Sequence, residues 1–328
     1  MSILVTGSIA NDHLMSFPGK FADSLVPEQL DRLTLSFLVE DLEVRRGGCG
    51  ANISFAMACM GLRPVLVGSV GEDFVDYRSW LERHGVDCES VHVSATKHTA
   101  RFVCTNDSTM AQIASFYAGA MSEAREIELG PIVARVGAPE YVIISPNDPE
   151  AMVRHTEECR ARGYDFVADP SQQMHWGDGE LIRTLIDGAT YLLSNDYEAA
   201  LATQKTGWSA AEILDRVGTH VITHGDKGVT INRKGEPVIE VPAVPTDHAL
   251  EPTGVGDAFR GGFVGALTWG LGLERAAQVG ALLATHVVEI VGNQEYVLSQ
   301  QAAMQRFTDA YGERAAADVA SHLRLPQP

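Results

Sequence analysis

Short apolar runs alternate with longer amphipathic stretches along most of this chain. The runs that predict buried strands cover residues 3–6, 64–68, 141–145, 165–169, 191–194 and 220–223. The stretches with apolar residues every three or four positions predict helices at 52–61, 74–84, 149–162, 179–185, 197–204, 210–216, 257–271 and 274–291. Strands that alternate with helices imply a mostly parallel sheet covered on both faces, and therefore an α/β fold.

One part of the chain departs from this alternation. Residues 101–105 and 112–117 predict a hairpin, and 36–39 and 42–45 predict two earlier strands. We expect these segments to form a small separate sheet, a lid made of residues 12–49 and 98–121. The large α/β domain then comprises residues 1–11, 50–97 and 122–328.

Charge and composition exclude several classes of function. The 328 residues include 25 Lys and Arg against 43 Asp and Glu, a formal net charge of −18, which argues against general nucleic-acid binding. Five widely spaced cysteines predict neither a disulfide framework nor a cysteine metal site, and they fit a reducing cytoplasm. No apolar run reaches the roughly 20 residues that span a bilayer, so we expect no membrane partner.

The tract Gly254-Val255-Gly256-Asp257 at a predicted helix start is the strongest chemical signal. Backbone N–H groups at a helix start can hold an anion, and glycine lets a ligand approach the backbone closely. A carboxylate beside a bound anion does not help binding, but it can accept a proton. The tract therefore suggests phosphoryl transfer to a hydroxyl, although a tight turn with close packing explains such glycines equally well.

Polar residues gather where predicted strands end, which is where open α/β sheets bind ligands. Gly48 and Asn52 flank a second glycine turn, where they form either a capped helix or a site for vicinal hydroxyls. Asn195 and Glu198 form either a capping pattern or, through Glu198, a water-mediated Mg²⁺ site. The remaining strand-end candidates are Ser8, Asp12, Asp169, Gln172, Gln173, Thr223 and Gly225.

These motifs, in this order along nearly the whole chain, resemble the ribokinase-like (PfkB) sugar kinases, and among them the bacterial adenosine kinases. The resemblance implies a ribokinase-like three-layer sandwich with a small β-sheet lid. It implies ATP-dependent phosphorylation of the adenosine 5′-hydroxyl to give AMP, with Mg²⁺ and with a monovalent cation such as K⁺ as a further candidate. A homodimer through the lid sheet is a further possibility in this family.

The resemblance also implies a role for each matching residue. Asp257 is the catalytic base, and Gly254, Val255 and Gly256 form the anion hole. The implied nucleoside-binding residues are Ser8, Asp12, Ser36, Gly48, Asn52, Phe102, Phe116, Gln172 and Gln173. The implied ATP-binding residues are Asn195, Thr223, Gly225, Asp226, Lys227, Gly228 and Gly256, with Glu198 near Mg²⁺.

Two departures from the family pattern stand out, and two alternatives stay open. Glu251-Pro252 replaces the usual Asp-Thr, which questions a cation or phosphate contact at position 251, and Val255 replaces the usual Ala. A ribokinase- or fructokinase-like sugar kinase would share the chemistry but would need no purine slot at Phe102 and Phe116. A catalytically silent nucleoside-binding regulator would share only the fold.

Overall fold

The computed structural model describes residues 2–25, 32 and 34–323. Its centre is an eight-stranded sheet in the order β14-β13-β12-β11-β10-β9-β1-β4. All neighbouring strands from β12 to β4 run parallel, while β13 and β14 add an antiparallel edge. In chain order these strands are β1 Ser2–Thr6, β4 Val65–Val67, β9 Pro139–Ile144, β10 Phe166–Ala168, β11 Tyr191–Asn195, β12 Thr219–Thr223, β13 Val229–Asn232 and β14 Ile239–Val241.

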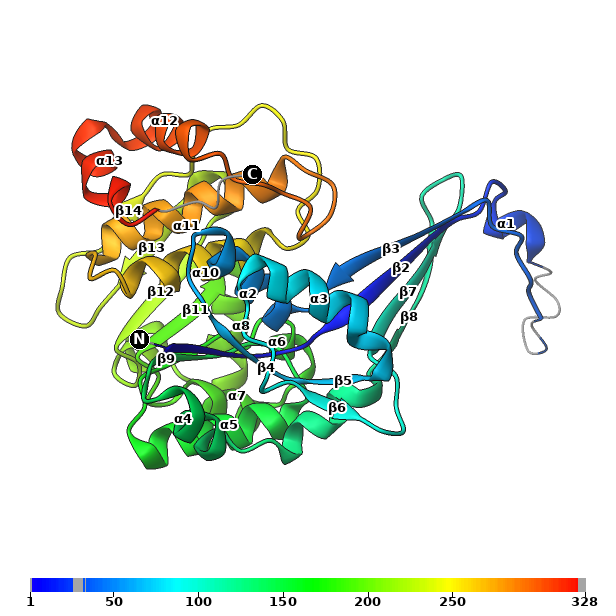
Figure 1. Cartoon of the computed structure of the whole chain (residues 1–328), viewed down its shortest axis with the longest axis horizontal. Helices are drawn as coiled ribbons and strands as arrows, with labels where there is room; N and C mark the ends of the chain where they lie inside the picture. Colours follow the sequence, from blue (N-terminus) through cyan, green and yellow to red (C-terminus); the bar gives the residue numbers. More distant parts are fainter. Residues whose placement is uncertain (1, 26–31, 33, 324–328) are drawn as a thin grey trace.

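Helices cover both faces of this sheet, so the body of the molecule has three layers (Figure 1). Alternate residues of β1 point into two separate cores, because successive side chains of a strand face opposite sides. One core packs against α2 Cys49–Cys59, α3 Val75–His84, α10 Val255–Leu267, α11 Leu273–Val288, α12 Gln300–Tyr311 and α13 Glu313–Ala320. The other packs against α4 Leu129–Val136, α5 Pro149–Arg162, α6 Gln173–Trp176, α7 Gly179–Ile186, α8 Asp196–Thr206 and α9 Ala210–Leu214.

A four-stranded sheet in the order β3-β2-β7-β8 projects from this body as a lid (Figure 1). Its strands are β2 Ala10–Ser16, β3 Asp41–Gly47, β7 Ala100–Asn106 and β8 Gln112–Tyr117. The predicted three-layer α/β sandwich, with a mostly parallel central sheet and a small β lid, is confirmed. A separate two-stranded pair, β5 Ser69–Gly71 and β6 His92–Ser94, lies beside it.

The strand predicted at residues 36–39 is wrong, because these residues form neither helix nor strand. Phe37 packs instead against Phe17 and Phe21, with ring centroids 4.8 and 4.9 Å apart. This aromatic cluster lies near α1 Phe21–Ser24 at the far tip of the lid (Figure 1). Packing of three aromatic rings against one another there takes the place of the strand pairing that the apolar run suggested.

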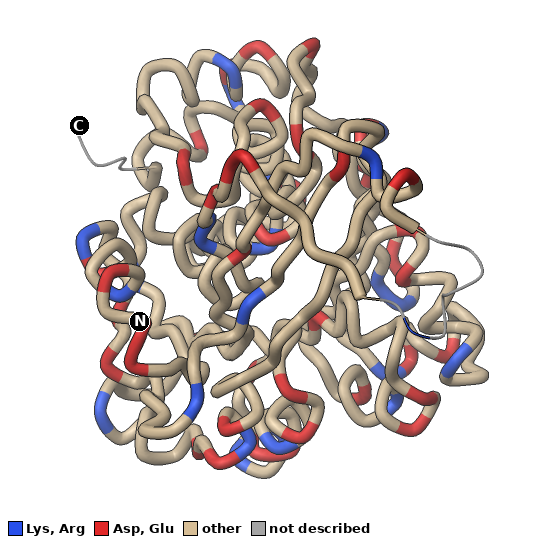
Figure 2. The backbone as a smooth tube through the Cα atoms, turned by 90° about the vertical axis from the view of Figure 1, so that its right-hand side faces the viewer, with Lys and Arg blue, Asp and Glu red and all other residues tan. Residues whose placement is uncertain are grey.

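The charge distribution matches the acidic composition. Figure 2 shows acidic and basic residues interspersed along the backbone, with the acidic ones more numerous. Among the residues that the structure describes, no helix is both long and apolar enough to cross a membrane.

Candidate active site

The start of α10 is an open backbone turn. Gly254 adopts a left-handed conformation with φ of 77°, and no side chain caps the helix there. The first N–H groups of an α-helix have no carbonyl one turn earlier in the helix to accept them. The N–H groups of Gly256 and Asp257 are therefore available to an anion, and the dipole of the 13-residue helix favours one.

Asp257 is fixed by a chain of hydrogen bonds that reaches the base of the lid. Its Oδ2 accepts a hydrogen bond from Asn52 Nδ2 at 2.9 Å. The Oδ1 of Asn52 accepts from Gln294 Nε2 at 2.9 Å, and the same amide lies 2.6 Å from the Tyr77 hydroxyl. Tyr77 in turn donates to the Gly47 carbonyl at 2.9 Å. The first turn of α10 is thus tied to α2 and to the end of strand β3.

Asp12 lies on the lid strand β2 against Gly47. A Cβ placed on Gly47 would stand only 2.9 Å from Asp12 Oδ2, so the absence of a side chain there makes room for the carboxylate. Burial raises the pKa of Asp12 to about 6; the Arg45 guanidinium lowers it and Glu251 raises it. Arg45 Nη1 also lies 2.9 Å from Glu251 Oε2, an ion pair between the lid and the loop before α10.

Phe102 and Phe116 lie on the same face of the lid as Asp12. Asp12 pairs with Phe102 across β2 and β7, and Phe102 pairs with Phe116 across β7 and β8. Directly opposed residues of neighbouring strands share a face of the sheet. The two rings and the carboxylate therefore form one row that is aromatic at its outer end, and Phe116 is 54% exposed.

The body of the protein supplies further polar groups around the two glycine turns. The Gln172 amide lies 3.6 to 3.7 Å from the Cys49 sulfur, at the start of α2. Gln173 Nε2 donates to the Asn147 carbonyl at 3.0 Å. The Ser8 hydroxyl accepts from Cys49 N–H at 3.0 Å, and a Cβ on Gly48 would stand 2.5 Å from the Ser8 carbonyl.

Ser36 lies away from Asp12, Phe102 and Phe116, the other nucleoside candidates on the lid. It lies beside Phe37 at the far tip of the lid and is exposed. Asp12 and Ser16 are four residues apart on β2, about 13 Å at 3.3 Å per residue. Ser36 lies beyond the Ser16 end of the strand, because Glu40 N–H already bonds the Ser16 carbonyl.

The candidate nucleotide residues meet at the ends of β11 and β12. Asn195 and Thr223 are register partners, and residues 225–227 form a short 3-10 turn directly after β12. Gly228 has φ of 98°, and a Cβ on it would stand 2.1 Å from the Val241 carbonyl, so only glycine fits. Asp226 and Lys227 are exposed on this turn.

Glu198 is more constrained than a free metal ligand would be. It completes a capping box with Asn195, whose N–H donates to Glu198 Oε2 at 2.9 Å. Its Oε1 accepts from the Ser171 hydroxyl at 3.3 Å. Among the described residues, no three His, Cys, Asp or Glu side chains are placed to hold a metal ion. Carboxylate oxygen suits Mg²⁺, so these residues fit an ion held through water and ATP rather than by the protein alone.

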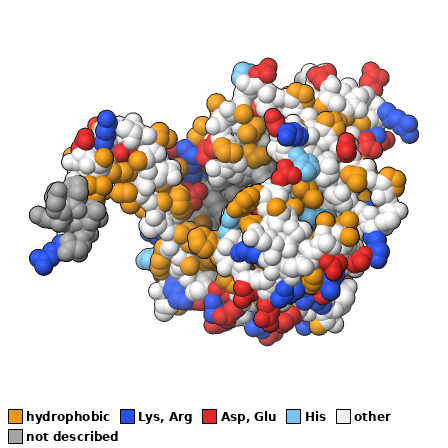
Figure 3. Space-filling view, turned by 180° about the vertical axis from the view of Figure 1, so that it is seen from behind, with side chains coloured by type: hydrophobic (Ala, Val, Ile, Leu, Met, Phe, Trp, Pro, Cys, Tyr) orange, Lys and Arg blue, Asp and Glu red, His pale blue; other side chains and the backbone are white. Residues whose placement is uncertain are grey.

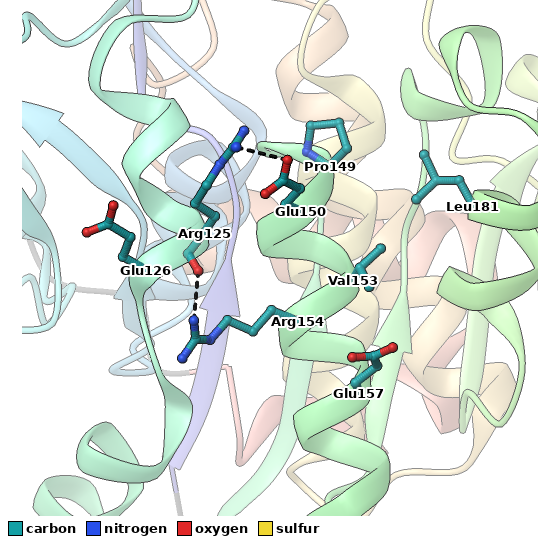
Figure 4. Close-up of a pocket in the computed structure, with 8 residues that line it drawn as sticks. All are labelled: Arg125, Glu126, Pro149, Glu150, Val153, Arg154, Glu157 and Leu181. Carbon is teal, nitrogen blue, oxygen red and sulfur yellow. Dashed lines mark hydrogen bonds and ion pairs between the residues drawn. The ribbon is translucent and has the colours of Figure 1, made fainter.

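A surface depression elsewhere on the molecule has a different character. Figure 4 shows its lining from Arg125 and Glu126, from α5 and from Leu181 of α7, and it contains none of the candidate residues. Its arginines are already paired: Arg125 with Glu150 at 2.9 Å, and Arg154 with Glu128 at 2.8 Å. It therefore offers no free charge for an anionic substrate.

Several residues of the site carried no signal in the sequence. Gln294, Tyr77, Cys49 and Arg260 contact or adjoin predicted residues, yet each is distant in sequence from most of its partners.

Comparison with known proteins first defines the class. A nucleoside kinase of Burkholderia thailandensis, solved in complex with inosine, matches with a TM-score of 0.82 at 32% identity, over 95% of this chain and 99% of that one. The chain therefore has the fold of a ribokinase-type phosphotransferase. A model of the pfkB family of carbohydrate kinases matches residues 20–300, and this chain belongs to that family.

Relatives of known name agree with this assignment. A nucleoside kinase of Methanothermobacter thermautotrophicus is 30% identical over 269 residues, which is 81% of this chain and 85% of that protein. A ribokinase of Haemophilus influenzae is 25% identical over 319 residues, 93% of this chain and 97% of that one. The class is thus a sugar or nucleoside kinase, and the relatives differ in the acceptor that their names give.

Proposed function

We propose that this protein transfers the γ-phosphoryl group of ATP to the 5′-hydroxyl of adenosine, giving AMP and ADP. The observation that carries the proposal is the Asp257 carboxylate, held by Asn52 at 2.9 Å beside the uncapped start of α10. A proton acceptor next to an anion-binding turn is what phosphoryl transfer to a hydroxyl requires.

In this proposal Asp257 removes the proton from the 5′-hydroxyl. The freed oxygen forms a bond to the γ-phosphorus while the bond from that phosphorus to the bridging oxygen of ADP breaks. The Gly254 to Gly256 turn, with Val255 between its glycines, stabilises the charge that develops on the transferring group. Asp12, Gly48 and Asn52 hold the ribose hydroxyls, because a carboxylate accepts and an amide both donates and accepts.

The nucleotide side uses the ends of β11 and β12. Asn195, Thr223 and the turn from Gly225 to Gly228 would line ATP, and Glu198 would hold Mg²⁺ through water. When bound, Mg²⁺ neutralises charge on the ATP phosphates. The residues present supply the backbone donors and the water-excluding lid.

Adenosine is proposed over a bare sugar because of the Phe102 and Phe116 row. A flat purine gains stacking surface there, while ribose or fructose gains none. Gln172 and Gln173 have amides that can pair with the edge of the base. We include inosine as the competing nucleoside, because the Burkholderia thailandensis kinase was solved with it.

Initial rates with adenosine, inosine, ribose and fructose at equal concentration, with MgATP, test the proposal. We expect kcat/KM to be highest for adenosine and at least 100-fold lower for both sugars. Preference for ribose would favour the sugar-kinase alternative. Absence of ATP consumption with every acceptor, while adenosine still binds, would favour the silent regulator. A dependence on K⁺ is checked by replacing it with Na⁺ in the same assay.

We also propose that two copies pair through the lid and that the protein works in the cytoplasm. The lid face opposite Asp12 carries Leu42, Val44 and Ile113, which are 59%, 55% and 48% exposed. Figure 3 shows hydrophobic side chains over the projecting lid, beside a hollow where it meets the body. Such an apolar strand face is a hazard unless it is covered.

Sedimentation of Val44→Glu tests the pairing. We expect the parent to sediment as a dimer and Val44→Glu as a monomer. The matched control is Val93→Glu, on the exposed β6 strand outside the lid. A parent that is monomeric at high concentration would reject the pairing.

A further inference from the structure

Arg260 is a buried cation beside the candidate anion-binding turn. It follows Asp257 by one turn of α10 and is only 7% exposed. Its side chain folds back along the helix toward the N-terminus, as helical side chains do. A Cβ placed on Gly256 would stand 2.5 Å from Arg260 Nη1, so the guanidinium lies directly against the first turn.

Two carboxylates from other elements meet this guanidinium. Asp169, after β10, has Oδ1 at 2.6 Å from Arg260 Nε, and Glu198, in the first turn of α8, has Oε2 at 3.8 Å from Nη2. The Nε–H vector does not point at either Asp169 oxygen, so the short contact is ionic rather than an aligned hydrogen bond. Arg260 is therefore shared between the two acids.

The surroundings explain why a permanent cation is needed here. Burial raises the pKa of Asp169 to about 7 and also raises the pKa of Asp257, and the Glu198 charge adds to both shifts. The Arg260 guanidinium opposes both shifts. ATP would add further negative charge beside them. Arginine stays protonated in proteins, so its charge does not depend on the state of its neighbours.

We propose that Arg260 is a positioning residue for phosphoryl transfer. It joins the end of β10 and the start of α8 to the start of α10, and it places a fixed positive charge behind the turn that would receive the transferring group. The inference rests on the proposed kinase function. It assigns Arg260 an effect on kcat, because negative charge on the phosphoryl oxygens beside the turn is stabilised during transfer.

The alternative is that Arg260 forms a buried ion pair that stabilises the fold and has no effect on phosphoryl transfer. Two variants separate the alternatives. Arg260→Gln removes the cation and leaves two buried carboxylates unopposed. Arg260→Gln with Asp169→Asn also removes one of these acids, which relieves the uncompensated burial without restoring the charge behind the turn.

We measure kcat, the KM of adenosine and thermal midpoints for both variants, with Arg275→Gln as the control. Arg275 is a part-buried arginine paired with Asp318 at 3.0 Å, at the far end of the α10–α11 hairpin. For Arg260→Gln we expect kcat to fall about 100-fold or more, with adenosine KM changed less than about threefold. The double variant should regain thermal stability but not kcat.

Three results would overturn the inference. One is a kcat within about threefold of the parent in Arg260→Gln. Another is a double variant in which kcat returns together with stability, which would make Arg260 structural. If Arg260→Gln does not fold, the double variant alone decides, and near-parental kcat there rejects the inference. A parent chain without nucleoside kinase activity would instead reject the proposed function, so the two failures are distinguishable.

Discussion

Replacing Asp257 by Asn changes one proton acceptor and almost no volume. The carbonyl oxygen of the new amide can take over the hydrogen bond that Asp257 Oδ2 accepts from Asn52 at 2.9 Å. Its NH₂ group would then face the incoming 5′-hydroxyl and could accept no proton. Nucleoside contacts through Asp12 and Gly48 are untouched, so Asp257→Asn isolates the proton-transfer step.

The magnitude follows from the role of a general base. Such a group contributes about 10²- to 10⁴-fold to the rate, which corresponds to about 3–5 kcal/mol of barrier at 1.36 kcal/mol per tenfold. We expect kcat to fall by that range and adenosine affinity to change less than about threefold, about 0.7 kcal/mol.

The Asp257→Asn variant should lose activity without losing thermal stability. Burial raises the pKa of the Asp257 carboxyl, while the Arg260 guanidinium opposes the shift. Because the folded-state pKa lies above the unfolded value, ionisation of Asp257 costs stability as the pH rises through the folded pKa. A neutral amide removes this cost, so the thermal midpoint at pH 7.5 should equal or exceed that of the parent.

The assay measures steady-state formation of AMP with saturating adenosine and MgATP, and calorimetry measures adenosine binding. The matched control is Asp76→Asn, an exposed carboxylate in the first turn of α3. A kcat of Asp257→Asn within tenfold of the parent would remove Asp257 from the role of base. Loss of adenosine binding would instead show that the carboxylate is needed to hold the substrate.

Contacts around the turn lead to three further expectations. Protonation of Asp12 below its pKa of about 6 removes a charged acceptor for a ribose hydroxyl. The adenosine KM should therefore rise roughly tenfold as the pH falls from 7.5 to 5. A KM that does not change with pH would exclude a contact between Asp12 and the ribose. A Cβ on Gly254 would stand 2.8 Å from the buried side-chain oxygen of Asn293, and Gly254 has a positive φ, so Gly254→Ala should cost about 1–3 kcal/mol of stability. Gly270 also has a positive φ but open space around it, so Gly270→Ala measures the backbone strain alone. Arg45→Ala breaks the pair with Glu251 and should raise adenosine KM up to about fivefold at low salt; an equal change in about 0.5 M salt would rule out the ion pair.

Much of the α/β body could be predicted because its signals are local. The helix at 149–162 has the predicted bounds: Asp148 caps it by accepting from Ala151 N–H at 3.2 Å, and Gly163 ends it in a left-handed conformation. Pro149 stands in its first turn, where the missing N–H costs nothing. Caps, breakers and an apolar stripe act within a few residues, and a single sequence displays all of them.

The lid was harder to predict because its strands depend on partners that are distant in the sequence. Strand β2 was missed, because Asn11, Asp12 and His13 interrupt the apolar pattern and the strand is only partly buried. Its extended form depends on pairing with β3 and β7, which are far away along the chain. Asp12 itself was still singled out, since its position after the first strand suggests a ligand-binding edge.

The contacts of the site also differ in how far the sequence predicts them. The Asn52–Asp257 contact joins two motifs that were each visible as a glycine turn opening a helix. Arg260 gave no such sign: a lone arginine in an apolar helix indicates nothing until its partners are known. Its partner Asp169 follows β10, and its partner Glu198 lies in the first turn of α8. Charge complementarity between distant segments is therefore the information that this sequence alone did not provide.

Glu251 shows how the departure from the family pattern acts in three dimensions. Its Oε2 lies 2.9 Å from Arg45 Nη1 and accepts from Gly292 N–H at 3.2 Å. The carboxylate is thus committed to the lid strand β3 and to the loop after α11, which leaves it poorly placed for a cation of its own. Because the same Arg45 lowers the pKa of Asp12, the residue that replaces the usual Asp is coupled through one arginine to the proposed ribose contact.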